Sequence, residues 1–240
     1  TSTVMTESTV PPNVMQELAT LDTPTVCNAL ELVVPERRGE GYTVRPLFCL
    51  RPEMQPIVGH ARTATVSAIK PSDLSAAEAK ILNDQYYEYM GTGPAPLINV
   101  IEDIDGENVG YGAWWGEVNT SIHHGLGSLG VITNGSIRDL PDSSPGFQLL
   151  AGSVSPSHAY IHVVEFNLDV TVMGMEVKHN DLIHADQHGA VVIPIEVAGK
   201  VKAAAEKIAA QEAIIISAAR EPGFDINRLR QAWKGDKEIH

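Results

Sequence analysis

The chain has 240 residues, which allows one large domain or two small ones, with a sizeable core. Its formal net charge of −13 argues against general binding to nucleic acid, because neutralising phosphates requires clustered Lys and Arg. No run reaches the roughly 18 apolar residues of a membrane span, and the first ten residues lack the pattern of a secretory signal.

The first part of the chain reads as a tail, a pair of helices and then mixed elements. Residues 1–11 are expected to form a disordered tail that Pro11 and Pro12 end. After a helical turn or two at 14–19, Asp22 or Thr23 is expected to cap a second helix with Pro24 at its first position. The elements expected next are a loop with a short strand over 35–56, a strand over 57–69, a helix from about 73 to 90 and a buried strand over 97–101.

The central stretch, residues 110–139, carries the groups with chemical potential. A glycine-bounded turn places Glu117 near the first turn of a short helix. The apolar run 129–133 predicts a buried strand, and Asn134-Gly135 predicts a turn after it. Arg138 and Asp139 then lie on a loop beyond a strand end, where α/β proteins commonly bind ligands.

The remainder reads as short strands followed by helices. Strands are expected over 158–164, 170–173, 175–177, 182–185 and 190–193. From about residue 196 the pattern is helical, and Asp225 is expected to cap a last short helix. Without an internal repeat or a clear linker, residues 12–240 are expected to form one α/β domain with a helical C-terminal extension.

Two cysteines, Cys27 and Cys49, match neither a disulfide framework nor a zinc ribbon. We therefore expect free thiols in a reducing compartment, which indicates a cytoplasmic protein. Nothing in the composition predicts a nucleic-acid or membrane partner.

Glu117, Arg138 and Asp139 together predict a site for a small anion. A helix N-terminus offers unpaired N–H groups, Arg138 offers a cation for a carboxylate, and Asp139 offers an acid for a metal. Taken by itself, the Arg138-Asp139 pair is equally typical of a surface ion pair, which contributes little.

An acid, twenty residues and then Arg-Asp is the pattern of one family, which the chain resembles from about residue 21 to 212. That family contains the class II pyruvate aldolases for 4-hydroxy-4-methyl-2-oxoglutarate and 4-carboxy-4-hydroxy-2-oxoadipate, and the regulator of ribonuclease E activity. Three further segments carry the resemblance: Leu-Asp-Thr-Pro-Thr-Val-Cys-Asn-Ala-Leu (21–30), Val-Gly-His-Ala-Arg-Thr-Ala-Thr-Val (58–66) and Asp-Leu-Ile-His-Ala-Asp-Gln-His-Gly-Ala-Val-Val-Ile-Pro (181–194).

The resemblance implies a swivelling β/β/α fold, assembled as a homotrimer or as a hexamer of two trimers with the active site at a subunit boundary. In the family, the residue matching Asp139 binds a divalent metal, and the acid matching Glu117 holds water on that metal. The arginine matching Arg138 faces the pyruvyl oxygen. Carboxylate and water ligands suit Mg²⁺ or Mn²⁺.

The function implied is a metal-dependent lyase that cleaves a 4-hydroxy-2-oxo acid to pyruvate, with oxaloacetate decarboxylation through the same enolate. The backbone N–H groups of Val118 and Asn119 would hold the carboxylate of the small 2-oxo acid. The alternative is a non-catalytic protein that regulates a ribonuclease by contact.

Two departures from the family bear on the substrate. Glu117 stands where the characterised aldolases carry Asp, so its carboxylate binds the metal either directly or through water. Trp114 and Trp115 replace part of a glycine-rich run, and they are expected either in the core or in a narrowed pocket.

Other acids and histidines offer competing sites. Glu212 lies on an apolar helical stripe, where it either snorkels to the edge or meets the metal of a neighbouring subunit, as a family glutamate does. Two histidine groups carry zinc-like spacing, although structural roles fit them better: His158 with His162, and His184 with Asp186 and His188. His123 and His124 follow Glu117 either on a solvated face or near the distal end of a substrate.

Overall fold

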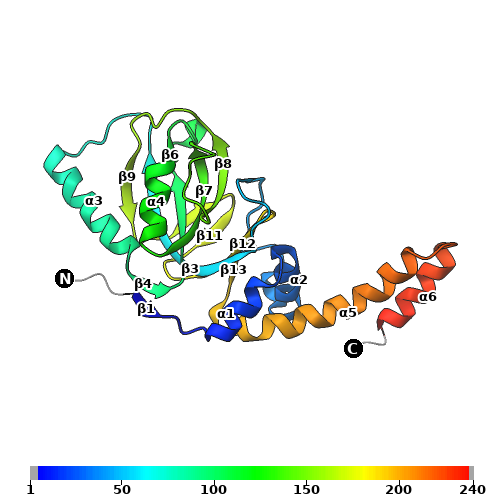
Figure 1. The fold of residues 1–240 in the computed structure, drawn as a ribbon. Coiled ribbons are helices and arrows are strands. Elements are labelled where there is room, and N and C mark those ends of the chain that lie inside the picture. The colour runs from blue at the N-terminus through cyan, green and yellow to red at the C-terminus, as the bar shows by residue number, and fades with distance from the viewer. Residues whose placement is uncertain (1–4, 238–240) are drawn as a thin grey trace.

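A curled mixed β-sheet forms the body of the protein in the computed structural model, which describes residues 5–237 (Figure 1). Its strands are β2 (Phe48–Cys49), β3 (Ile57–Ser67), β5 (Leu97–Asp103), β6 (Ala113–Trp115), β7 (Ser128–Ile137), β8 (Gln148–Val154), β9 (His162–Phe166), β12 (Leu182–Asp186) and β13 (Gly189–Ile193). They run in the order β13-β12-β3-β5-β7-β8-β2, with β6 paired to β7 and β9 paired to β3. Neighbours among β3, β5, β7 and β8 are parallel, as are β6 and β7.

Three apolar clusters hold the helices and a hairpin against this sheet. Helices α1 (Pro12–Ala19), α2 (Thr23–Val33) and α5 (Val201–Ala219) pack with β12 and β13. Helix α3 (Ala76–Met90) packs its last turn beside β9 and the buried residues of β7 and β8. The hairpin of β10 (Val170–Val172) and β11 (Met175–Val177) closes the third cluster. The further elements are α4 (Glu117–Gly125), α6 (Ile226–Lys237), β1 (Met5–Glu7), β4 (Gly93–Ala95) and the short 3₁₀ turns η1 (Pro35–Arg37), η2 (Gly106–Asn108) and η3 (Ile195–Lys200).

Helix starts follow local chemistry as expected. The side chain of Asp22 accepts a hydrogen bond from the backbone N–H of Thr25 at 2.8 Å and caps α2. Ser75 and Glu78 form a reciprocal capping box at the start of α3, with bonds of 3.2 and 2.9 Å. Both caps satisfy backbone donors that the first helical turn leaves unpaired.

Strand β7 is longer than its sequence predicts, because Asn134-Gly135 is not a turn. The Asn134 amide accepts from the backbone N–H of Asp103 at 2.7 Å and donates to the Asp103 carbonyl at 3.0 Å. The pairing of β7 with β8 shifts register between Thr133 and Ser136, which is the mark of a bulge. The strand therefore continues to Ile137 and delivers Arg138 directly at the sheet edge.

The expectation of a disordered tail over residues 1–11 is wrong for its described part. Strand β1 pairs in parallel with β4, and Ser8 Oγ lies 2.6 Å from His60 Nε2. Val10 is buried in the cluster with α1 and α2. These contacts are made to distant segments, which local sequence does not reveal. Residues 1–4 lie outside the described part.

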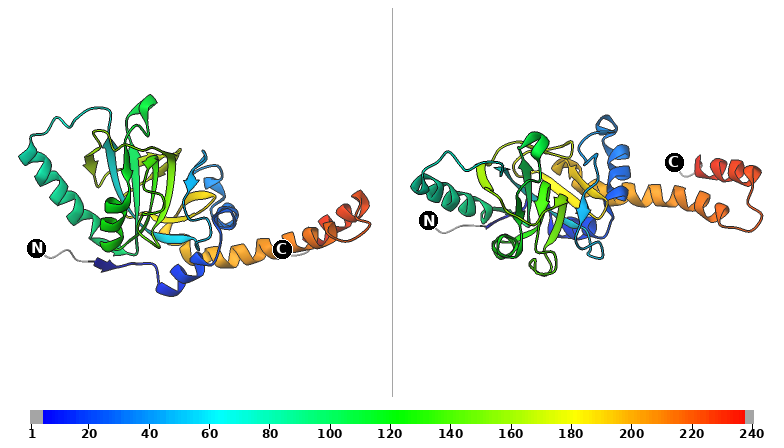
Figure 2. Two further views of the ribbon diagram at one scale, coloured as in Figure 1. Left: turned by 45° about the horizontal axis from the view of Figure 1, so that its top comes forward. Right: turned by 90° about the horizontal axis from the view of Figure 1, so that it is seen from above.

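The C-terminal helices form an arm that extends from the body. Only the first turns of α5 are buried, at Val201, Ala204 and Ala205. Figures 1 and 2 show α5 running away from the sheet and α6 folding back alongside it. No helix in residues 5–237 is both long enough and apolar enough to cross a membrane. The expected α/β fold with a helical C-terminal extension is confirmed.

Candidate functional site

Parallel pairing of β6 with β7 brings the three predicted groups to one edge of the sheet. Trp115 lies opposite Ile137, and the backbone N–H of Arg138 donates to the Trp115 carbonyl at 3.1 Å. The residues that follow each strand therefore meet: Gly116 and α4 after β6, and Arg138-Asp139 after β7. The same edge is where the carboxyl ends of parallel strands commonly bind ligands.

Asp139 is held against the start of α4. Its Oδ2 accepts a hydrogen bond from the backbone N–H of Glu117 at 3.0 Å. A Cβ at Gly116 would lie 2.4 Å from that oxygen, so only glycine leaves room for this approach. Asp139 has φ of +53°, in the left-handed region that costs a non-glycine residue energy and is often retained at functional sites.

Arg138 presents a cation beside this carboxylate. Its Nε lies 4.0 Å from Asp139 Oδ2, and its side chain is 34% exposed. Nε itself is buried and has no hydrogen-bond partner among the described residues. The guanidinium thus holds unused donor capacity at the sheet edge.

The first turn of α4 has two free backbone donors. The N–H of Glu117 is taken by Asp139, and the N–H of Thr120 donates to the Gly116 carbonyl at 3.0 Å. The N–H groups of Val118 and Asn119 find no acceptor within residues 5–237. They are the donors that the helix dipole makes favourable for an anion.

Asp139 and Glu117 offer oxygen donors that fit a hard divalent cation. Both side chains are exposed, and Oδ1 of Asp139 makes no hydrogen bond within the described chain. No group of three or more His, Cys, Asp or Glu able to hold a metal gathers within residues 5–237. Mg²⁺ in proteins is commonly bound by one or two carboxylates. Water, substrate or a neighbouring chain would supply its remaining ligands here.

Glu212 does not join these groups within one chain. It is exposed on α5 and lines a groove of about 370 Å³ against α2, with Glu31 and Arg38 on the facing side. Figure 1 places α5 on the far side of the body from α4. A role for Glu212 at Asp139 therefore requires a second copy of the chain.

The histidine pairs with zinc-like spacing have structural partners. His184 Nδ1 lies 2.9 Å from Thr23 Oγ1 and its Nε2 lies 2.9 Å from the Leu18 carbonyl. Asp186 accepts from the backbone N–H groups of Thr23 and His188, both at 2.8 Å. Hydrogen bonding to these groups, with the nearby His188, holds the pKa of Asp186 below its ordinary value despite burial. The segment therefore anchors the start of α2.

The other histidines also differ from their sequence reading. Strand β9 begins at His162, so His158 lies outside it and the two do not share a strand face. His123 is fully buried rather than solvated, with Nε2 2.7 Å from the Tyr86 hydroxyl and Nδ1 2.8 Å from the Asn119 carbonyl. Burial lowers the pKa of His123 to about 4. His124 Nδ1 lies 2.8 Å from Ser144 Oγ.

Trp114 and Trp115 belong to an aromatic cluster under α4. Trp115 is 1% exposed, and its ring centroid lies 4.5 Å from that of His123. Trp114 lies 5.6 Å from Tyr86 by the same measure. The core interpretation is thus correct for Trp115, whereas Trp114 is half-buried and packs against the same cluster. The sequence signal for this packing was a pair of aromatic residues followed by Gly-Glu, with a histidine about two helical turns later.

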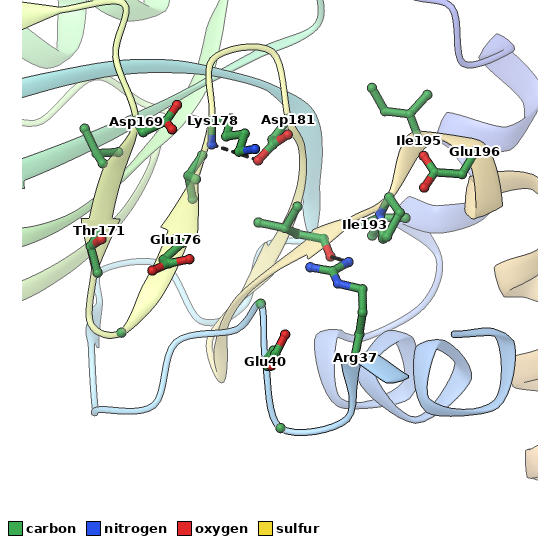
Figure 3. Close-up of a pocket in the computed structure, with 17 residues that line it drawn as sticks. Arg37, Glu40, Asp169, Thr171, Glu176, Lys178, Asp181, Ile193, Ile195 and Glu196 are labelled. Atoms are coloured by element: carbon green, nitrogen blue, oxygen red, sulfur yellow. Dashed lines mark hydrogen bonds between the residues drawn. The ribbon is translucent and has the colours of Figure 1, made fainter. Parts of the chain in front are cut away.

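A cavity of about 870 Å³ lies elsewhere. It sits between the β10–β11 hairpin, the 37–41 loop and the end of β13, as Figure 3 shows. Its lining mixes the cations Arg37 and Lys178 with five acids, Glu40, Asp169, Glu176, Asp181 and Glu196. Asp181 accepts from the Lys178 backbone N–H at 2.8 Å, so this carboxylate already has a hydrogen-bond partner. Glu117, Arg138 and Asp139 do not line this cavity.

Solved structures share this fold at low sequence identity. A protein from Pseudomonas syringae pv. tomato str. DC3000 matches with a TM-score of 0.67 and 20% identity, over 94% of this chain and 98% of its own. RraAS2 of Streptomyces coelicolor, described as an unusual member of the RNase ES inhibitor RraA family, matches with a TM-score of 0.66 and 18% identity, over 87% and 97%. The RNA-processing inhibitor RraA from Thermus thermophilis matches with a TM-score of 0.50 and 19% identity, over 69% of this chain and 90% of its own.

At the level of sequence, no curated protein matches the chain. A family model described as RraA-like, aldolase/RraA, matches residues 23–192, which include Glu117, Arg138 and Asp139. The protein therefore belongs to the aldolase/RraA family.

Proposed function

We propose that the protein is a divalent-metal-dependent carbon–carbon lyase that cleaves a 2-oxo acid and releases pyruvate. The observation that carries this proposal is the meeting of Arg138, Asp139 and the first turn of α4 at one sheet edge. Cleavage of a 2-oxo acid builds negative charge on one oxygen. A cation, a metal-binding carboxylate and free N–H donors are the groups that stabilise such charge.

Substrate binding would begin at the helix. The free N–H groups of Val118 and Asn119 would hold the carboxylate of the 2-oxo acid, and the α4 dipole would favour its charge. Arg138 would then face the 2-oxo oxygen. The carboxylate and the 2-oxo oxygen would thus orient the substrate.

Mg²⁺ or Mn²⁺ is the cation that these residues suit. Asp139 would hold it directly, Glu117 directly or through water, and Glu212 would approach from a neighbouring subunit. When bound, the ion would supply Lewis-acid stabilisation of charge on the 2-oxo oxygen.

The residues of the chain account for the proton and charge movements. The carboxylate of Glu117 would orient the water that takes the 4-hydroxyl proton. The C3–C4 bond then breaks, C4 becomes a carbonyl, and the electron pair passes to the pyruvate enolate, whose oxygen Arg138 stabilises. Protonation at C3 by water yields pyruvate. Loss of CO₂ from oxaloacetate produces the same enolate.

A homotrimer, or a hexamer of two trimers, would complete the site. Figures 1 and 2 show the α5–α6 arm projecting from the body, so its outer face is available to another copy. A head-to-tail contact of this kind closes into a ring when the rotation permits. Glu212 would then lie beside the Asp139 of the next subunit.

The test is pyruvate release from oxaloacetate and from 4-hydroxy-4-methyl-2-oxoglutarate, with and without EDTA, followed by addition of Mg²⁺. We expect release that EDTA abolishes and Mg²⁺ restores. The rival function is inhibition of a ribonuclease through protein contact, since RraAS2 belongs to a family of RNase ES inhibitors and the Thermus protein is an RNA-processing inhibitor. No pyruvate release under any condition, together with inhibition of a ribonuclease, would favour that rival.

A further inference from the structure

The buried face of α4 is polar, which is the reverse of an ordinary amphipathic helix. Asn119 is 7% exposed, while Thr120 and His123 are fully buried. The apolar Val118 and Ile122 instead face outward. Burying a polar side chain costs stability unless it is hydrogen-bonded, so each member of this face requires a partner.

Two of these three side chains have their partners. Thr120 Oγ1 donates to the Gly116 carbonyl at 2.7 Å and accepts from the backbone N–H of Ser144 at 2.9 Å. Both ring nitrogens of His123 lie within hydrogen-bonding distance of a partner. Neither the Nδ2 nor the Oδ1 of Asn119 has one among the described residues, although both atoms are buried. Asn119 is thus the exception on its own helix face.

The position of Asn119 associates it with the proposed substrate site. It stands in the first helical turn, and its backbone N–H is one of the two free donors there. Side chains in an α-helix lean toward the helix N-terminus, which directs Asn119 toward Gly116 rather than down the helix. Another buried donor without a partner lies beside that glycine: Nε of Arg138, 3.2 Å from where a Gly116 Cβ would lie.

We propose that Asn119 is a specificity-determining residue that recognises the hydroxyl group of a 4-hydroxy-2-oxo acid. The inference rests on the proposed lyase function and deepens it by naming the substrate class. An amide with both its donor and its acceptor unmet needs a group that accepts and donates. The carboxylate and the ketone of a 2-oxo acid only accept, whereas a hydroxyl does both.

The amide is buried in the unliganded chain, so contact with a substrate requires its side chain to change rotamer. That movement gives up no existing hydrogen bond, because the buried pose has none. Binding a hydroxyl-bearing substrate therefore satisfies two groups that the free protein leaves unpaired. Oxaloacetate has no 4-hydroxyl group and gains nothing from this contact.

The test compares two substrates in Asn119→Leu, with Asn119→Ala as a second variant should the larger side chain not fit. The ratio of kcat/KM for 4-hydroxy-4-methyl-2-oxoglutarate to that for oxaloacetate should fall by about tenfold or more. The melting temperature of Asn119→Leu should not fall, because the lost amide had no partner. As a control, Thr120→Val should lower the melting temperature through loss of the Ser144 bond while leaving the substrate ratio unchanged.

Each outcome decides between the two proposals. An unchanged ratio in both Asn119 variants overturns the role of Asn119 and leaves the lyase intact. A wild-type protein that decarboxylates oxaloacetate but never cleaves the 4-hydroxy acid likewise overturns the role of Asn119 and leaves the lyase function intact. A wild-type protein that releases pyruvate from neither substrate overturns the lyase function, and the role of Asn119 with it.

Discussion

Asp139 Oδ2 lies 3.0 Å from the backbone nitrogen of Glu117, so the acid of the Arg-Asp pair caps the helix that begins with the other acid. One carboxylate oxygen thereby fixes the position of Asp139, while Oδ1 stays free for a ligand. The contact also ties the end of β7 to the start of α4. Anything that moves one of the two residues displaces the other.

Gly116 is the position most sensitive to a small change. In Gly116→Ala the new methyl group would collide with Asp139 Oδ2 and press on Arg138 at 3.2 Å. Because misplacing reacting groups by about 1 Å can cost roughly 10²-fold in rate, we expect a loss of that order in kcat. Steady-state kinetics measures this loss in kcat, and a urea titration measures separately any change in the free energy of unfolding.

Gly125→Ala is the matched control at the other end of α4. A Cβ there meets nothing within 4 Å. Replacing a helical glycine with alanine should raise the unfolding free energy by about 0.5–1 kcal/mol and leave kcat unchanged. Equal kinetics for the two alanine variants would contradict the positioning role of Gly116.

Asp139→Asn separates the cap from the metal-binding role. Asparagine can still accept the Glu117 N–H bond and tolerates a positive φ, so the fold should remain intact. Loss of the charge should abolish Mg²⁺-stimulated pyruvate release. The exposed Asp142, which makes no side-chain hydrogen bond in the described chain, serves as control in Asp142→Asn. Full Mg²⁺ stimulation in Asp139→Asn would rule out Asp139 as the metal ligand.

Arg138 is expected to act on the enolate rather than only on substrate binding. A fixed cation gains more from the enolate oxygen than from the neutral ketone, so Arg138→Ala should lower kcat by about 10²-fold or more, with a smaller change in KM. Arg138→Lys should restore only part of this, because lysine keeps the charge but loses the planar fork. The same Ala variant should slow exchange of the pyruvate methyl protons in deuterated water. A rise in KM alone, with exchange unaffected, would reduce Arg138 to a carboxylate anchor.

Glu212 can be tested by mixing subunits. If each site combines Asp139 of one copy with Glu212 of the next, Asp139→Asn and Glu212→Ala should each be defective as pure oligomers. Random mixed oligomers should then recover about a quarter of wild-type activity. In an equal mixture, half of the sites receive an intact Asp139 and, independently, half receive an intact Glu212 from the neighbouring copy. Light scattering establishes the assembly. No recovery on mixing, or a fully active monomer, would remove Glu212 from the site.

His123 predicts a fall in stability at mildly acidic pH. Burial lowers its pKa from 6.5 to about 4 in the folded chain, so between these values the unfolded chain binds a proton that the folded chain rejects. Stability present above pH 6.5 should therefore be lost as the pH falls toward 4, by about 3 kcal/mol in total. Urea titrations at several pH values should show a shallower loss for His123→Gln. The exposed His158 supplies the control: His158→Gln should reproduce the wild-type profile.

Local chemistry was readable without the structure. Asp22 predicted the cap of α2, because a cap and its N–H partner lie within a few residues of each other, while Pro24 takes the second helical position and not the expected first. The apolar run of β7 and the pattern from Glu117 to Asp139 located the candidate site. These signals depend on residues that are close in sequence or on a fixed order along the chain, and both can be read from the sequence without a structure.

Partners distant in sequence decided the rest. Asn134-Gly135 reads as a turn until Asp103, 31 residues away, takes up its side chain and the strand continues. His123 reads as exposed until Tyr86 covers it. The contact between Asp139 and the N–H of Glu117 exists because β6 and β7 pair in parallel and end at one edge. The sequence by itself determined which chemical groups the chain carries and where its helices begin. Strand pairing between distant segments determined which of these groups meet. The energy of that pairing depends on segments that only the folded chain brings together, so local sequence does not reveal it.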